Sequence, residues 1–209
     1  MTALDLPGEA PLGPSDPNAM LRELTDPKTL RALTHPVRLA LLEALALEGP
    51  LTATQAGELI GESPTTCSFH FRQLAKYGFV EEAGAGPGRQ RPWKVSHTGM
   101  HFSDVTDDPE MSIAAKSLER MVFDRAMSRF ASFLDAKSSY SKEWQESAQN
   151  AETLLWVTPE ELREVTTEIL TVFSRYYDRI ADPSARTEGA LPVEVLMLSY
   201  PVRLERGNA

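Results

Sequence analysis

Apolar residues between positions 27 and 77 recur at the spacing of amphipathic helices, interrupted by capping and helix-breaking residues. The pattern predicts four helices, at about residues 27–33, 36–48, 53–60 and 64–77. Thr52 and Ser63 are suited to cap the last two helices, and Gly61 and Gly78 are suited to end them. A short capped helix, a glycine turn and a second capped helix form a helix-turn-helix pattern.

Two short β-prone runs follow the fourth helix. FVEEAG at 79–84 and PWKVS at 92–96 flank the turn AGPGRQR. The proline, the glycines and the basic residues of this turn predict a hairpin with an exposed, positively charged tip, which carries Arg89, Gln90 and Arg91. A helix-turn-helix followed at once by such a hairpin is typical of a winged helix.

The pattern changes after residue 96. Helical spacing predicts one long helix at about 109–136, and a capping box beginning at Thr158 predicts another through about Ile180. ETLLWV at 152–157 and the β-rich run at 191–204 predict two paired strands.

The expected fold class is therefore mainly α with small β. A winged helix-turn-helix domain occupies residues 26–96, and an α+β dimerisation or sensory domain occupies 97–209. Residues 1–25 are rich in proline and lack periodicity, which predicts a disordered tail.

The charge is unevenly distributed along the chain. The net charge is −9, yet residues 22–96 hold nine Lys or Arg against eight Asp or Glu, so the acidity lies mostly after residue 96. This distribution permits nucleic-acid binding by the winged helix. It argues against non-specific attraction to phosphates as the main activity.

Several classes of function lack their sequence signals. No apolar run is long enough to span a membrane and the N-terminus has no features of a signal peptide, so a cytoplasmic protein without a membrane partner is expected. There is no glycine-rich phosphate loop, nucleophile elbow or credible Ser-His-Asp set, so we expect neither an enzyme nor a cofactor.

The fourth helix carries the candidate DNA-binding residues. At 100° per residue its outward arc holds hydroxyl, aromatic and basic side chains, whereas a solvated face would normally hold Glu and Lys. Hydroxyls can approach base edges or phosphates, and Arg72 can pair with guanine. The predicted contact residues are Ser63, Thr65, Thr66, Ser68, Phe69, Arg72 and Lys76. The alternative is an ordinary exposed helix face.

The amino-acid sequence of residues 27–95 contains motifs of a known protein family. HPVRLALLEAL at 35–45 begins the second helix, and the recognition-helix pattern is carried by Ser63, Ser68, His70, Leu74, Gly78 and Val80. These motifs resemble those of the arsenical-repressor-like (ArsR-type) winged-helix transcription regulators. The resemblance implies a homodimer that binds an imperfect palindrome of double-stranded DNA with one recognition helix per half-site.

Metal sensing, which the founding members of that family perform through cysteine pairs in the third helix, is not expected here. The third helix reads ATQAGELI and has no thiol, and the single cysteine, Cys67, falls on the inward face of the fourth helix. His97, His101 and Asp104 would share a face if helical, but Gly99 disfavours a helix there. We therefore expect no metal site.

The long helix at 109–136 is the candidate dimerisation element because the small remaining domain cannot cover its full length. Its apolar stripe includes Met111, Leu118, Val122 and Phe130. The sequence leaves open whether an unknown small-molecule or protein effector binds the C-terminal domain. It also leaves open the alternative of a winged-helix protein–protein adaptor without specific DNA binding.

Overall fold

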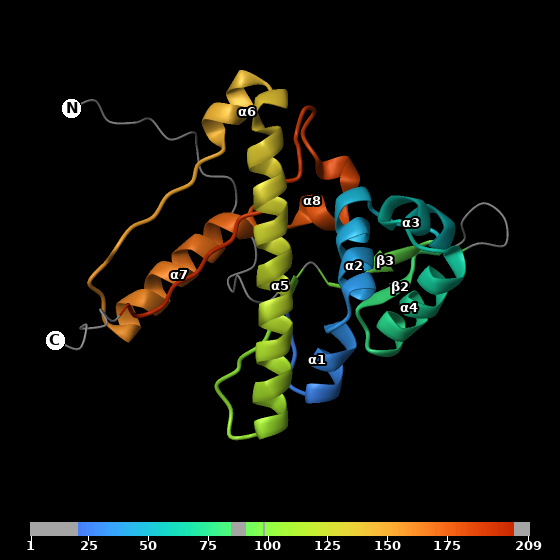
Figure 1. Cartoon of the computed structure of the whole chain (residues 1–209), viewed down its shortest axis with the longest axis horizontal. Helices are drawn as coiled ribbons and strands as arrows, with labels where there is room; N and C mark the ends of the chain where they lie inside the picture. Colours follow the sequence, from blue (N-terminus) through green and yellow to red (C-terminus); the bar gives the residue numbers. More distant parts are fainter. Residues whose placement is uncertain (1–20, 85–90, 98, 203–209) are drawn as a thin grey trace.

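The computed structural model describes residues 21–84, 91–97 and 99–202. The helices are α1 (Pro27–Leu33), α2 (Pro36–Glu48), α3 (Ala53–Ile60), α4 (Pro64–Lys76), α5 (Pro109–Ala136), α6 (Lys142–Ser147), α7 (Pro159–Ser174) and α8 (Asp178–Ala181). The strands are β1 (Leu21–Glu23), β2 (Val80–Glu82), β3 (Trp93–Val95) and β4 (Gly99–His101). In Figure 1, α5 stands between α2, α3 and α4 on one side and α7 on the other. The prediction of a mainly α protein with small β is confirmed.

The predicted boundaries of α1 to α4 are confirmed by their caps. Thr52 and Gln55 form a reciprocal capping box at the start of α3, and Gly61 ends that helix in the left-handed conformation with φ of 73°. Ser63 Oγ accepts a hydrogen bond from the Thr66 amide at 3.0 Å and so caps α4. A Cβ at Gly57 would lie 2.5 Å from the Glu62 carbonyl oxygen, so glycine permits the close turn between α3 and α4.

One apolar core joins the helix-turn-helix to the first half of α5. Leu30, Leu33, Leu41 and Phe71 are buried in it, together with residues of α5. The α5 members are Met111, Ala114, Ala115 and Leu118.

This packing corrects part of the predicted dimer interface. Met111 is 6% exposed and Leu118 is 1% exposed within a single chain, because both pack in its own core. Val122 is 41% exposed but lines a cavity on the same side of α5. Of the four predicted dimer residues, only Phe130 lies outside this core-facing stripe.

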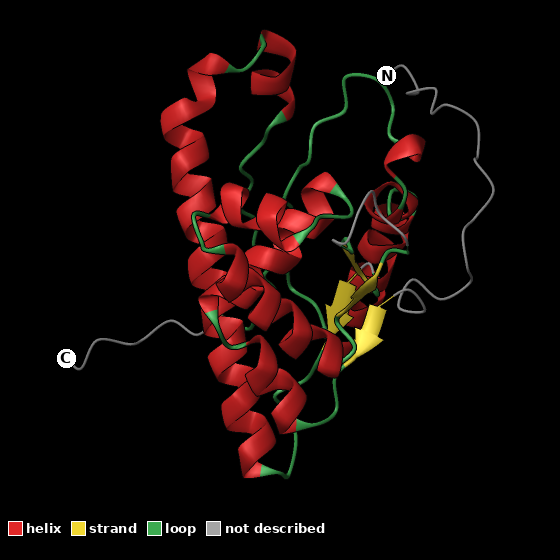
Figure 2. Cartoon of the chain, turned by 90° about the vertical axis from the view of Figure 1, so that its right-hand side faces the viewer, coloured by secondary structure: helices red, strands yellow, loops and turns green. Residues whose placement is uncertain are grey.

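The hairpin after α4 forms as predicted in its described part. β2 and β3 pair antiparallel, with Val80 opposite Val95, and Figure 2 shows the strands gathered in one small part of a largely helical molecule. Leu51 and Trp93 exchange two backbone hydrogen bonds, of 2.9 and 2.7 Å. The Trp93 ring stacks on Phe71 at 5.6 Å between centroids, so Trp93 packs against the core behind the wing.

The predicted tail is wrong for its last residues. β1 pairs in parallel with β4, with Arg22 opposite Met100, and Leu24 is buried. The Arg22 guanidinium donates a 2.6 Å hydrogen bond to the Tyr77 carbonyl at the end of α4 and lies over the Phe79 ring. Three paired residues are too few for a recognisable strand pattern, which explains why the sequence did not reveal β1. The rest of the predicted tail, residues 1–20, lies outside the described residues.

The two strands predicted in the C-terminal part do not form. Residues 152–157 and 191–202 have neither helix nor strand, and their apolar side chains are largely exposed. A strand requires a partner for its backbone hydrogen bonds, and the two segments do not pair with each other. The predicted helix through Ile180 is interrupted after Ser174 and resumes as α8.

The recognisable motif residues His35, Arg38 and His70 form a polar cluster between helices. His35 caps α2 by accepting from the Val37 amide, and its ring lies 4.5 Å from that of His70. Arg38 donates to the Ala32 carbonyl at 2.7 Å and to Nδ1 of His70 at 3.4 Å. These motif residues therefore stabilise the helix junction.

We expect this cluster to make stability depend on pH. Burial, followed by the nearby His35 and Arg38, lowers the pKa of His70 in the folded chain below its ordinary value of 6.5. The unfolded chain then binds more protons, so stability is full above about pH 6.5 and falls as the pH drops below it, by at most about 1.4 kcal/mol per pH unit. Urea unfolding at about pH 7.5 and 5.5 would give the free energy of unfolding at each pH. The difference between the two values should be smaller for His70→Gln than for wild type. His101→Gln, at an exposed strand position, should leave this difference in unfolding free energy at its wild-type value. An equal difference in all three proteins would contradict the assignment of the pH dependence to His70.

Candidate nucleic-acid interface

The two faces of α4 differ as the sequence predicts. Cys67, His70, Phe71 and Leu74 are buried against α2 and α3, whereas Thr65, Phe69, Arg72 and Lys76 are exposed and Ser68 is half-buried. Phe69 is 49% exposed, although its ring edge touches His70 at 5.2 Å between centroids. The outward face thus holds an aromatic ring, two small hydroxyls and two cations on one rigid helix.

Two of the predicted contact residues have a structural role. The hydroxyls of Ser63 and Thr66 lie 2.8 Å apart, and Ser63 also caps the helix. Both remain at the N-terminus of α4, where backbone amides and the helix dipole favour an anion such as a phosphate. Their side chains are already engaged with each other, so they are poorly placed to read bases.

Arg72 is the best-placed residue for reading bases. It lies near the middle of the exposed face, and in the part of the chain that the structure describes it forms neither a salt bridge nor a side-chain hydrogen bond. Lys76 lies at the end of α4, with Nζ 5.7 Å from the centre of the Tyr77 ring. This position suits contact with a phosphate at the edge of a groove.

The basic side chains in the described part of the wing are paired with carboxylates. Arg91 pairs with Glu82 at 2.6 Å on the neighbouring strand, and Lys94 pairs with Glu81 at 3.0 Å. The hydrogen bond to Glu82 raises the pKa of Arg91 above its ordinary value. Arg91 is therefore already paired, while the predicted contacts Arg89 and Gln90 lie outside the described residues.

Cys67, His97 and His101 are residue types that could support redox or metal chemistry, although the sequence predicts no metal site. Cys67 is fully buried, and burial raises the pKa of its thiol, which keeps it protonated. His101 lies in β4, so the helical spacing considered for His97 and His101 does not form. Within the described ranges, no three His, Cys, Asp or Glu side chains gather into a group that could hold a metal.

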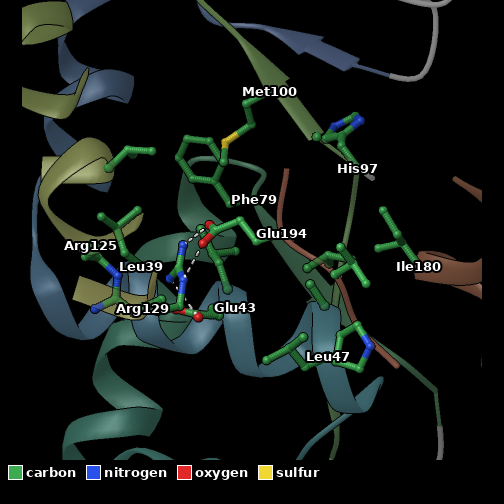
Figure 3. A pocket seen from close by; sticks show the side chains of 17 residues that line it. Leu39, Glu43, Leu47, Phe79, His97, Met100, Arg125, Arg129, Ile180 and Glu194 are labelled. Atoms are coloured by element: carbon green, nitrogen blue, oxygen red, sulfur yellow. Dashed lines mark hydrogen bonds and ion pairs between the residues drawn. The ribbon is translucent and has the colours of Figure 1, made fainter. Parts of the chain in front are cut away.

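A cavity of about 500 Å³ lies between the winged helix, α5 and the C-terminal segment. Arg129 lies at one end of it, between Glu43 of α2 and Glu194 (Figure 3). Arg129 binds Glu194 through two parallel hydrogen bonds, one of 3.0 Å from Nε, and this pairing raises the pKa of Arg129. Glu43 also binds Arg125.

Sequence reasoning missed this polar cluster. The available signal was the spacing of Arg125 and Arg129, four residues apart on the same side of α5 as Leu118 and Val122. Charged residues inside an apolar stripe require partners.

Comparison with known proteins identifies the class of the N-terminal part. Residues 33–83 match the family model of a helix-turn-helix domain. The match covers α2, α3, α4 and β2, the elements that build and orient the face described above. The chain therefore contains a helix-turn-helix domain, the domain of a DNA-binding regulator.

The chain matches no curated protein. None of the helices in the described ranges is long and apolar enough to cross a membrane.

Proposed function

We propose that this protein is a sequence-specific, ArsR-like transcription regulator that acts in the cytoplasm as a homodimer on a palindromic operator, by binding and without catalysis. The observation that carries the proposal is the exposed face of α4, where Phe69, Arg72 and Lys76 project from a helix anchored by a buried apolar face. An arginine on a recognition helix can bind guanine through two hydrogen bonds in the major groove.

Exposed apolar surface in the C-terminal half supports the homodimer. No residue of α7 is fully buried, although its sequence is strongly amphipathic, and Leu154, Trp156 and Tyr200 are at least 71% exposed. Large apolar side chains that stay exposed in this number indicate an interaction surface. A second copy of the chain would cover it.

The packing of α5 also indicates where two copies could meet. Phe123, Met127, Phe130 and Leu134 follow one another at spacings of four, three and four residues, the repeat of a helix–helix seam. They lie on the side of α5 away from Leu118, and Met127 and Leu134 are 37% and 54% exposed. We propose this seam in place of one through Met111, Leu118 and Val122.

The direct test is selection of bound fragments from fragmented genomic DNA with the purified full-length protein. We expect enrichment of one sequence with two-fold symmetry and half-sites about one helical turn apart. Affinity for this sequence should exceed affinity for unrelated duplex by at least about 10³-fold at physiological salt. Weak binding that depends on salt but not on sequence, or no binding, would instead favour a protein–protein adaptor.

A further inference from the structure

The cavity beside α2 and α5 combines apolar walls with one charged end. Its apolar lining includes Leu39, Leu42, Leu47, Phe79, Val122 and Ile180. The charged end is the cluster of Arg125, Arg129, Glu43 and Glu194 (Figure 3). At about 500 Å³ the cavity has the size of pockets that enclose small organic ligands. Such a site fits a molecule with an apolar body and a single charged group.

The placement of the four charged residues determines which charge the ligand should carry. Arg125 and Arg129 are on α5 and Glu43 is on α2, so the helix-borne part of the cluster has one excess positive charge. Glu194 supplies the balancing carboxylate from an irregular segment. Within residues 187–202, the hydrogen bonds that Glu194 accepts from Arg129 are the only ones described that tie the segment to the rest of the chain. Glu194 is therefore the replaceable partner, and its replacement must be an anion.

We propose that the cavity binds small amphipathic carboxylic acids. The ligand carboxylate takes the place of Glu194 on the Arg129 guanidinium, and the hydrocarbon part lies among the leucines of α2 and Phe79. The planar fork of Arg129, which now holds Glu194 through two parallel bonds, is equally suited to a ligand carboxylate. Glu194 thus acts as an internal competitor that occupies Arg129 when no ligand is present.

The same site is connected to the DNA-binding helices. Glu43, Leu39 and Leu42 belong to α2, which packs against α3 and α4. Arg186 further joins the C-terminal part to the end of α2 by donating to the Leu47 carbonyl at 2.9 Å. A role of the bound acid as an effector rests on the proposed DNA-binding function, whereas binding of the acid does not.

The test is isothermal titration calorimetry on the full-length protein without DNA, using octanoate, octan-1-ol and octylamine as probes of equal chain length. Wild type should bind octanoate about tenfold more tightly than octanol, because only the acid gains the arginine contact. Glu194→Gln should strengthen octanoate binding by about fivefold, the effect of removing one competing ion pair. Glu188→Gln removes the same charge from an exposed position outside the cavity and should change nothing.

Arg129→Gln should abolish the preference for octanoate over octanol while leaving binding of octanol in place. Equal binding of the acid and the alcohol to wild type, no binding of octanoate, or no effect of Glu194→Gln would each overturn the proposal. Tighter binding of octylamine, weakened by Glu194→Gln, would identify a cation site and overturn it as well. Because no DNA is present, this result is independent of whether an operator is found.

Discussion

Replacing Arg72 with alanine is expected to weaken operator binding by about 1–3 kcal/mol for each half-site and to relax base preference at one position of each half. Arg72 is exposed at the centre of the outward face of α4, while Cys67, Phe71 and Leu74 on the opposite face are buried. The substitution therefore removes a side chain from the proposed DNA-binding face and leaves the core intact. Fluorescence anisotropy with the selected operator and with single-base variants would measure both effects.

Two further variants separate base reading from simple charge. Arg72→Lys keeps the charge but loses the planar fork, so it should retain affinity for unrelated duplex and lose base discrimination. Arg175→Ala removes one positive charge from an exposed position after α7 and should change neither quantity. If Arg72→Ala binds the operator and its variants like wild type, Arg72 does not read bases.

The sequence predicted the winged helix closely because its signals are local. Thr52, Ser63 and Gly61 fix the ends of α3 and α4 through contacts within four residues, and the apolar spacing of α4 determines which face is buried. The outward position of Arg72 follows from these two facts alone. Such signals do not depend on the rest of the fold.

The features that the sequence did not reveal depend on contacts between distant residues. β1 pairs with β4, and Arg22 donates to the Tyr77 carbonyl, so both contacts involve residues more than fifty positions further along the chain. The salt bridge of Arg91 with Glu82 requires the strand register of the hairpin, which the sequence does not specify.

The sequence also could not predict which side of α5 is buried. Helical spacing identified apolar residues along its whole length but could not tell which stripe meets α1. The structure buries Met111 and Leu118 in the core and leaves Met127 and Leu134 exposed. Long helices with apolar residues on more than one side need tertiary information to assign each face.

Replacing Met127 and Leu134 with glutamate is expected to convert the proposed homodimer into a folded monomer. Both side chains are exposed in the single chain, so the substitutions should cost little within the protomer but would place charges inside an apolar seam. Light scattering after size exclusion would report the mass, and urea unfolding would report whether the protomer stays folded. Ser117→Glu with Ser128→Glu adds the same two charges at exposed positions beside the seam and should leave the dimer in place.

Loss of the dimer should reduce operator affinity by at least about 100-fold, because a single winged helix reads too few base pairs to select one site in a genome. Two copies related by a two-fold axis double the number of base pairs read, and the seam on α5 would set the distance between their α4 helices. Displacement of Glu194 from Arg129 would act on this same helix, so an acid bound in the cavity could change operator binding through α5. If the seam variant remains dimeric, α5 is not the dimerisation element. If wild type is a monomer that still binds its operator tightly, reading by paired recognition helices is wrong.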